Sequence, residues 1–189
     1  MVEKWVFVVG YMGAGKSTSG LRLAKLMNLP FFDTDSALRE RHECSISTLF
    51  DQQGEAAFRR MECEILRELV ASNPRGLIST GGGTPCHGAN MDFMRDNGTV
   101  VYLKMPAESL VERLRGRADQ RPLLAGLVAD EMLTFVTDHL AQRSVHYERA
   151  DITVDARHFD LDRMKSVRSL IEGRTWFNPS EPPRQDRDH

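Results

Sequence analysis

The sequence predicts an α/β fold, in which a five-stranded parallel sheet lies between two layers of helices. Five short apolar segments alternate along the chain with stretches whose apolar residues recur at helical spacing. The two clearest segments, residues 5–9 (WVFVV) and 99–103 (TVVYL), show no apolar–polar alternation, as expected for strands covered on both faces. Strands that alternate with helices pair in parallel through right-handed crossovers, so the helices cover both faces of the sheet.

Each predicted element has a local signal. Leu23, Leu26 and Met27 indicate a helix after the first strand, and a longer apolar period indicates another over residues 54–72. The strands are expected at residues 5–9, 31–33, 77–79, 99–103 and 152–154.

Two further helices have recognisable boundaries. Pro106 suits the first turn of a helix that ends near Leu114. Asp160 is placed to cap a helix over residues 161–172, which Gly173 would end. These signals place helices after the fourth and fifth strands, as the alternating pattern requires.

The length of 189 residues suits one globular domain, expected over residues 1–173. Residues 174–189 contain three prolines and no apolar period, so we expect a flexible tail. The 25 Lys and Arg against 27 Asp and Glu predict no general attraction to nucleic acid or to a membrane surface. The longest unbroken apolar run, at residues 5–9, is too short to span a bilayer.

The cysteines and the N-terminal sequence predict a cytoplasmic location. Cys44, Cys63 and Cys86 show neither a C-x-x-C pair nor zinc-ligand spacing, which favours three reduced thiols. The first residues lack the apolar core of a signal peptide. No interface pattern is visible, so we expect a monomer.

A phosphate-binding motif follows the first strand. Residues 10–17 (GYMGAGKS) match G-x-x-x-x-G-K-[ST] and open a helical stretch, the context that this motif requires. Its glycines let backbone N–H groups converge on phosphate oxygens, Lys16 neutralises the β- and γ-phosphates, and Ser17 can bind Mg²⁺. The alternative is a glycine-rich turn with a surface lysine. The predicted nucleotide contacts are Gly13, Ala14, Gly15, Lys16, Ser17 and Thr18.

No N-K-x-D sequence of a GTPase occurs, although residues 51–54 (DQQG) match D-x-x-G. That match lies in a polar helical stretch rather than at a strand end, so we interpret it as accidental. A short chain with about five strands favours a small-molecule kinase.

Two carboxylates close the second strand. Ligands of open parallel sheets gather at the carboxyl ends of the strands, so Asp33 and Asp35 are expected to face the cleft beside the phosphate motif. Asp33 is placed to hold Mg²⁺, directly or through water. Asp35 is placed to hydrogen-bond an acceptor hydroxyl or to deprotonate it. The alternative is that Asp35 caps a helix over residues 36–42.

Two arginines and three glycines predict the chemistry of the acceptor. Arg59 and Arg143 suit a phosphate or a carboxylate, because a guanidinium group pairs bidentately with either. Gly81, Gly82 and Gly83 follow the third strand, where bare backbone can approach a ligand. Asp35 disfavours a second phosphate nearby, so an acceptor with one carboxylate and several hydroxyls fits best.

A charged loop after the Pro106 helix is predicted to be a lid. Residues 117–126 (RADQRPLLAG) hold Arg117 and Arg121 four residues apart, with proline and glycine between two helices. Such a loop can bring positive charge over a transferring phosphate. The alternative is an ordinary helix–helix connection.

Together these motifs resemble those of the shikimate kinases, over residues 5–172. The resemblance rests on GYMGAGKST (10–18), DTD (33–35), GEAAFRRME (54–62), TGGG (80–83), RPLL (121–124) and Arg143 four residues before Tyr147. It implies a three-layer P-loop kinase fold with a substrate-binding helical region at about 34–62 and a lid at about 115–126. It also implies ATP- and Mg²⁺-dependent phosphorylation of the 3-hydroxyl of shikimate, on the route to aromatic amino acids.

The resemblance assigns roles by position. Shikimate contacts fall on Asp35, Arg59, Gly82 and Arg143, within the wider turn of residues 81–83. The catalytic residues are then Lys16, Asp35 and Arg121, and the metal side consists of Ser17 and Asp33. Adenine contacts fall on Arg117 and on Arg157, in the loop after Val154. Two other functions remain open: a gluconate-kinase-like sugar-acid kinase, and a nucleotide-binding module without catalysis.

Overall fold

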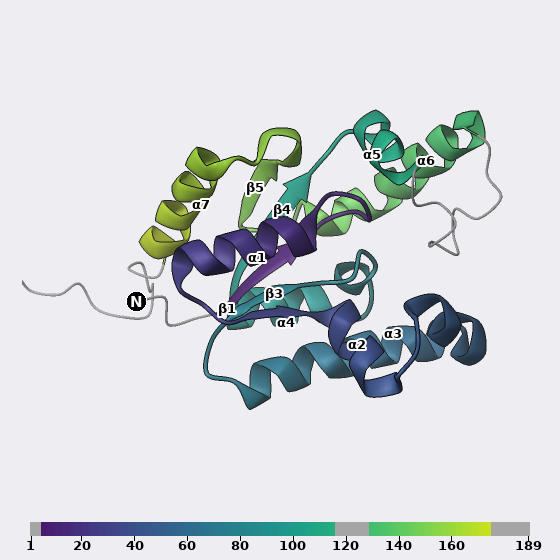
Figure 1. The fold of residues 1–189 in the computed structure, drawn as a ribbon, viewed down its shortest axis with the longest axis horizontal. Helices are drawn as coiled ribbons and strands as arrows, with labels where there is room; N and C mark the ends of the chain where they lie inside the picture. The colour runs from purple at the N-terminus through teal and green to yellow at the C-terminus, as the bar shows by residue number, and fades with distance from the viewer. Residues whose placement is uncertain (1–4, 116–128, 175–189) are drawn as a thin grey trace, which may run out of the picture.

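The computed structural model describes residues 5–115 and 129–174, and a five-stranded sheet lies at its centre (Figure 1). The strands run in the order β2-β3-β1-β4-β5, and all neighbours are parallel. Their bounds are β1 Trp5–Val9, β2 Phe31–Asp33, β3 Leu77–Ser79, β4 Gly98–Lys104 and β5 Ile152–Asp155. The predicted fold class and sheet are therefore confirmed, with β4 and β5 slightly longer than expected.

Helices connect the strands. Their bounds are α1 Lys16–Met27, α2 Thr34–His42, α3 Ile46–Ser72, α4 Asn90–Asn97, α5 Ala107–Leu114, α6 Ala129–Tyr147 and α7 Leu161–Arg174. Pro106 occupies the N-cap of α5, and Asp160 accepts a hydrogen bond from the Arg163 N–H at the start of α7, as predicted. Helix α7 runs past the expected stop at Gly173, which does not have a positive φ.

Helix α3 begins eight residues earlier than the predicted range of 54–72. Ser45 caps it by accepting a hydrogen bond from the Thr48 N–H at 3.0 Å, a signal that the apolar period does not contain. Gly54 interrupts the helix with a φ of 73° and a ψ of 165°. The result is a kinked helix whose two parts point in different directions.

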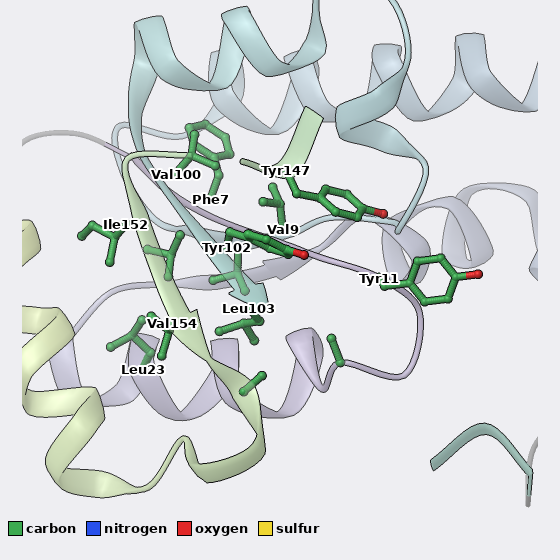
Figure 2. Packing of buried hydrophobic residues seen from close by; sticks show 14 of the residues in the cluster. Phe7, Val9, Tyr11, Leu23, Val100, Tyr102, Leu103, Tyr147, Ile152 and Val154 are labelled. Atoms are coloured by element: carbon green, nitrogen blue, oxygen red, sulfur yellow. The ribbon is translucent and has the colours of Figure 1, made fainter. Parts of the chain in front are cut away.

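Helices cover both faces of the sheet. Helices α1 and α7 pack together on one face, and α4 and α6 lie on the other (Figure 1). Figure 2 shows this alternation along β4: Leu103 faces Leu23 of α1, whereas Tyr102 faces Tyr147 of α6. The central strand β1 is buried throughout, which explains its unbroken apolar sequence.

The topology brings three loops to one edge. Because β1, β2 and β3 are parallel neighbours, the segments that follow Val9, Asp33 and Ser79 all leave the sheet at its carboxyl edge. Within residues 5–115 and 129–174, no helix is long and apolar enough to cross a membrane. The lid residues 116–128 and the tail residues 175–189 lie outside the described part of the chain.

Candidate active site

The P-loop lies between β1 and α1. Gly10, Gly13 and Gly15 have φ values of 145°, 82° and 89°, which side chains rarely allow. Helix α1 begins at Lys16, whose Nζ donates a hydrogen bond to the Tyr11 carbonyl oxygen at 3.0 Å. The loop thus combines a helix N-terminus with a lysine held across it, an arrangement that binds phosphate. Ala14 is buried in this loop, and Thr18 is exposed on the first turn of α1.

Asp33 links the P-loop helix to the acceptor side. Its Oδ2 accepts a hydrogen bond from the Ser17 hydroxyl at 2.6 Å, and its Oδ1 accepts one from the Ser36 N–H at 3.0 Å. Asp33 is therefore the N-cap of α2, and the alternative in which Asp35 caps a helix over residues 36–42 is wrong. Asp35 instead lies in the first turn of α2.

The oxygen donors at Ser17 and Asp33 fit Mg²⁺. This ion prefers hard oxygen ligands and usually combines one or two carboxylates with substrate phosphates. Among the described residues no group of three or more His, Cys, Asp or Glu side chains forms a metal site. Water and substrate phosphate oxygens would therefore complete the coordination of Mg²⁺ at Ser17 and Asp33. The three cysteines are free thiols.

A cavity lies beside the P-loop. It encloses about 100 Å³, and its polar lining includes Asp35, Arg59 and Arg143 together with the glycine turn of residues 81–83. Met12, Ile46, Phe50 and Phe58 form its apolar wall. The structure thus brings every predicted acceptor residue into one cavity. We call this cavity the acid pocket.

Arg59 is held in place by two carboxylates on its own helix. Its guanidinium group contacts Glu62 at 2.7 Å and Glu55 at 3.1 Å. Burial lowers the pKa of Arg59, because it disfavours the charged form. Glu62 and Glu55 raise it by more, so the pKa of Arg59 lies above its usual range. Glu62 is buried and also accepts a hydrogen bond from the Thr84 hydroxyl at 2.6 Å. Sequence analysis did not assign this role to Glu62, although its i,i+3 spacing from Arg59 is a signal for such a pair.

The glycine turn is closely packed, most tightly at Gly81 and Gly83. A Cβ on Gly81 would collide with Glu62, and a Cβ on Gly83 would collide with the Arg59 guanidinium group. Gly82 faces the P-loop, where a Cβ would lie 3.3 Å from the Met12 nitrogen. The Gly81 N–H donates a hydrogen bond to the Thr34 hydroxyl at 2.9 Å, which ties the turn to α2.

Helix α6 joins the acid pocket to the P-loop. Its His139 Nδ1 lies 2.9 Å from the Tyr11 hydroxyl, and its Arg143 guanidinium group lies 5.9 Å from the centre of the Tyr11 ring. Burial, assisted by Arg143 and Arg59, lowers the pKa of His139 to about 4. Burial also raises the pKa of Tyr11 to about 12, against the effect of Arg143. At neutral pH a protonated tyrosine is therefore hydrogen-bonded to a neutral histidine, a partnership that the sequence analysis missed.

The remaining predicted residues lie elsewhere. Arg117 and Arg121 fall outside the described residues. Arg157 does not line the acid pocket; it pairs with Asp155 at 2.6 Å and lines a second groove, beside Tyr102 and Met105.

This fold and site define a P-loop enzyme of the small-molecule kinase type, with a phosphate cradle beside a pocket that two arginines and an aspartate line. Residues 12–172 match the sequence profile of the family described as shikimate kinase. The chain belongs to the shikimate kinase family.

Individual relatives agree with this assignment. A shikimate kinase of Parabacteroides distasonis is 46% identical over 153 residues, which cover 81% of this chain and 88% of that protein. The crystal structure of shikimate kinase from Bacteroides thetaiotaomicron superimposes with a TM-score of 0.78 at 34% identity, covering 92% of this chain and 99% of the other. Shikimate kinase from Acinetobacter baumannii in complex with shikimate gives a TM-score of 0.77 at 30% identity, covering 92% and 96%.

Proposed function

We propose that this protein is a kinase that transfers the γ-phosphoryl group of ATP to the 3-hydroxyl of shikimate, giving shikimate 3-phosphate and ADP. The observation that carries the proposal is the acid pocket, in which Arg59, Arg143, Asp35 and the glycine turn meet next to the P-loop. Membership of the shikimate kinase family supports both substrates. The reaction belongs to the biosynthesis of aromatic amino acids.

The acid pocket separates two tasks. Arg59 and Arg143 pair with the carboxylate of the acceptor, since guanidinium groups bind carboxylates through parallel hydrogen bonds. Asp35, on the first turn of α2, accepts a hydrogen bond from the hydroxyl that attacks, and orients it or takes its proton. Because Asp35 comes from α2 whereas Arg59 and Arg143 come from α3 and α6, the hydroxyl and the carboxylate of the acceptor have separate partners, which favours one orientation of the ring.

Charge neutralisation takes place on the P-loop side. Lys16 and the N-terminus of α1 bind the β- and γ-phosphates of ATP. Ser17 and Asp33 would hold Mg²⁺, which neutralises phosphate charge when it is bound with the nucleotide. We assign Arg121 to the transferring phosphate and Arg117 and Arg157 to adenine, on the resemblance to the family alone. We further propose a cytoplasmic monomer; the free thiols support a reducing compartment.

An assay of ADP release tests the proposal. The purified protein is given ATP and Mg²⁺ with shikimate, with gluconate, or with no acceptor. We expect release that depends on shikimate, and a product phosphorylated at the 3-hydroxyl by NMR. Release with gluconate alone would favour a sugar-acid kinase, and ATP binding without release would favour a non-catalytic module.

A pair of arginine variants ties that activity to the acid pocket. Arg143→Ala should weaken shikimate binding by about 2–5 kcal/mol, because it removes one partner of a desolvated charge pair. Arg149→Ala is the matched control, since Arg149 lies just after α6 and pairs with Asp92 at the surface. Calorimetric titration with shikimate measures both; an unchanged dissociation constant for Arg143→Ala would remove Arg143 from the site.

A further inference from the structure

Tyr147, the last residue of α6, lies behind the acid pocket and does not line it. Its side chain is completely buried, and its hydroxyl donates a hydrogen bond to the Gly82 carbonyl oxygen at 2.6 Å. Arg143, one helical turn earlier, interacts with the same hydroxyl. One phenol therefore contacts two residues that line the acid pocket, although 65 residues separate Tyr147 from Gly82 along the chain.

The bond to Gly82 fixes the direction of a peptide group. Glycine has more conformational freedom than any other residue, so a turn of three glycines does not by itself fix its carbonyl groups. Because Tyr147 lies behind the pocket, the Gly82 carbonyl that it binds points away from the cavity. If that carbonyl turned into the cavity, its partial negative charge would repel a carboxylate. The hydroxyl thus keeps an acceptor group out of a site that needs donors.

The hydroxyl remains a donor over the whole working pH range. Burial raises the pKa of Tyr147 far above its ordinary value, and the neighbouring Arg143 does not offset this. Packing also keeps the ring in place, since the Tyr102 ring of β4 lies 5.2 Å away (Figure 2). Packing in the core therefore fixes the position of the Tyr147 hydroxyl, and this hydroxyl in turn fixes the orientation of the Gly82 carbonyl group.

We propose that Tyr147 is a positioning residue for acceptor binding, which holds the Gly82 carbonyl out of the acid pocket and orients Arg143 toward the acceptor carboxylate. This inference rests on the proposed function, because it assigns Tyr147 to the binding of the same acid. It predicts an effect on shikimate binding that is separate from phosphoryl transfer.

The test is Tyr147→Phe, which keeps the ring and removes only the hydroxyl. The matched control is Tyr102→Phe, because Tyr102 is equally buried in the same ring pair but lines the second groove. We expect Tyr147→Phe to raise the KM for shikimate about tenfold, with kcat and the KM for ATP changed by less than about threefold. Tyr102→Phe should leave the KM for shikimate unchanged, since Tyr102 does not line the acid pocket. Calorimetry should show the loss of shikimate affinity for Tyr147→Phe alone.

The readout separates positioning from folding. Partial unfolding of Tyr147→Phe would lower the apparent kcat, which scales with the fraction of folded enzyme. It would leave KM unchanged, because KM is a property of the folded molecules and does not depend on how many there are. A KM for shikimate that stays within about twofold of that of Tyr102→Phe overturns the inference, whatever happens to kcat. A wild-type protein that does not act on shikimate overturns the proposed function instead, so the two failures are distinguishable.

Discussion

Glu62 is a buried carboxylate that holds two parts of the acid pocket together. It pairs with Arg59 of its own helix and accepts a hydrogen bond from Thr84, which follows the glycine turn. A buried charge is tolerated only when it is paired and hydrogen-bonded, and both conditions hold for Glu62. The pair fixes Arg59 against Gly83 before any acceptor binds, which lowers the entropy lost on binding.

At the residue scale we predict that Glu62→Gln lowers the free energy of unfolding by about 3 kcal/mol, because it leaves the Arg59 guanidinium group without its buried counter-charge. Urea denaturation measures the change. Glu68→Gln is the control: Glu68 pairs with Arg41 on the surface, and its loss should change stability by less than about 1 kcal/mol. Equal effects of the two substitutions would contradict the buried-pair interpretation.

At the scale of elements, the kink in α3 shapes the acid pocket. The part of α3 before Gly54 carries Ile46 and Phe50, and the part after it carries Phe58 and Arg59. All four side chains line one cavity, which a straight helix of the same length would not allow. The backbone of Gly54 lies in a region that is almost exclusive to glycine. Its function is conformational, since a Cβ there would meet no atom within 4 Å.

We therefore predict that Gly54→Ala lowers the free energy of unfolding by about 2 kcal/mol through backbone strain alone. Gly173→Ala in α7 is the matched control, because this glycine also has open space around its Cβ position but has no positive φ. That substitution should raise stability slightly, as alanine does in a helix. Thermal unfolding of both variants checks whether Gly54→Ala lowers stability and Gly173→Ala raises it. If Gly54→Ala left the free energy of unfolding unchanged, the kink could relax without a cost in free energy.

At the scale of the whole molecule, one hydrogen bond connects the first strand's loop with the helix that carries Arg143. Tyr11 and His139 are 128 residues apart, and their side chains meet between the P-loop and α6. His139 has its pKa lowered to about 4, and burial together with Arg59 also lowers the pKa of His87. Protons therefore bind to the unfolded chain more tightly than to the folded one.

The sign of the pH dependence follows from linkage. Above pH 6.5 His139 is neutral in both states, so it makes no contribution to the slope. As the pH falls from 6.5 towards 4, the unfolded state gains a proton that the folded state does not, and stability falls. We predict that the urea midpoint of the wild type drops more steeply over this window than that of His139→Gln. His42→Gln, at an exposed site in α2, should follow the wild type; parallel curves for all three would refute the assignment to His139.

Much of the fold could be predicted from the sequence because its signals are local. The apolar strands and the P-loop glycines can each be recognised from a pattern of fewer than ten residues. The parallel order of the strands then places Asp33, Asp35 and the glycine turn at the carboxyl edge of the sheet. The partnerships could not be predicted in this way. The hydrogen bonds of Tyr147 with Gly82 and of His139 with Tyr11 depend on how α6 packs against the sheet. No short sequence pattern encodes that packing.

The close packing around Gly82 limits which wall of the acid pocket can accept substitutions that change the choice of acceptor acid. A Cβ on Gly82 would lie 3.3 Å from the Met12 nitrogen, 3.6 Å from the Gly10 oxygen and 3.7 Å from the Arg143 guanidinium group, so a larger residue would displace the P-loop backbone or Arg143. Substitutions at position 82 would therefore disturb the P-loop as well as the acid pocket. The opposite wall, with Ile46, Phe50 and Phe58, consists of side chains that can be exchanged. Divergence towards a differently shaped acid must therefore begin on that wall, and a directed-evolution library confined to it would leave the phosphate cradle untouched.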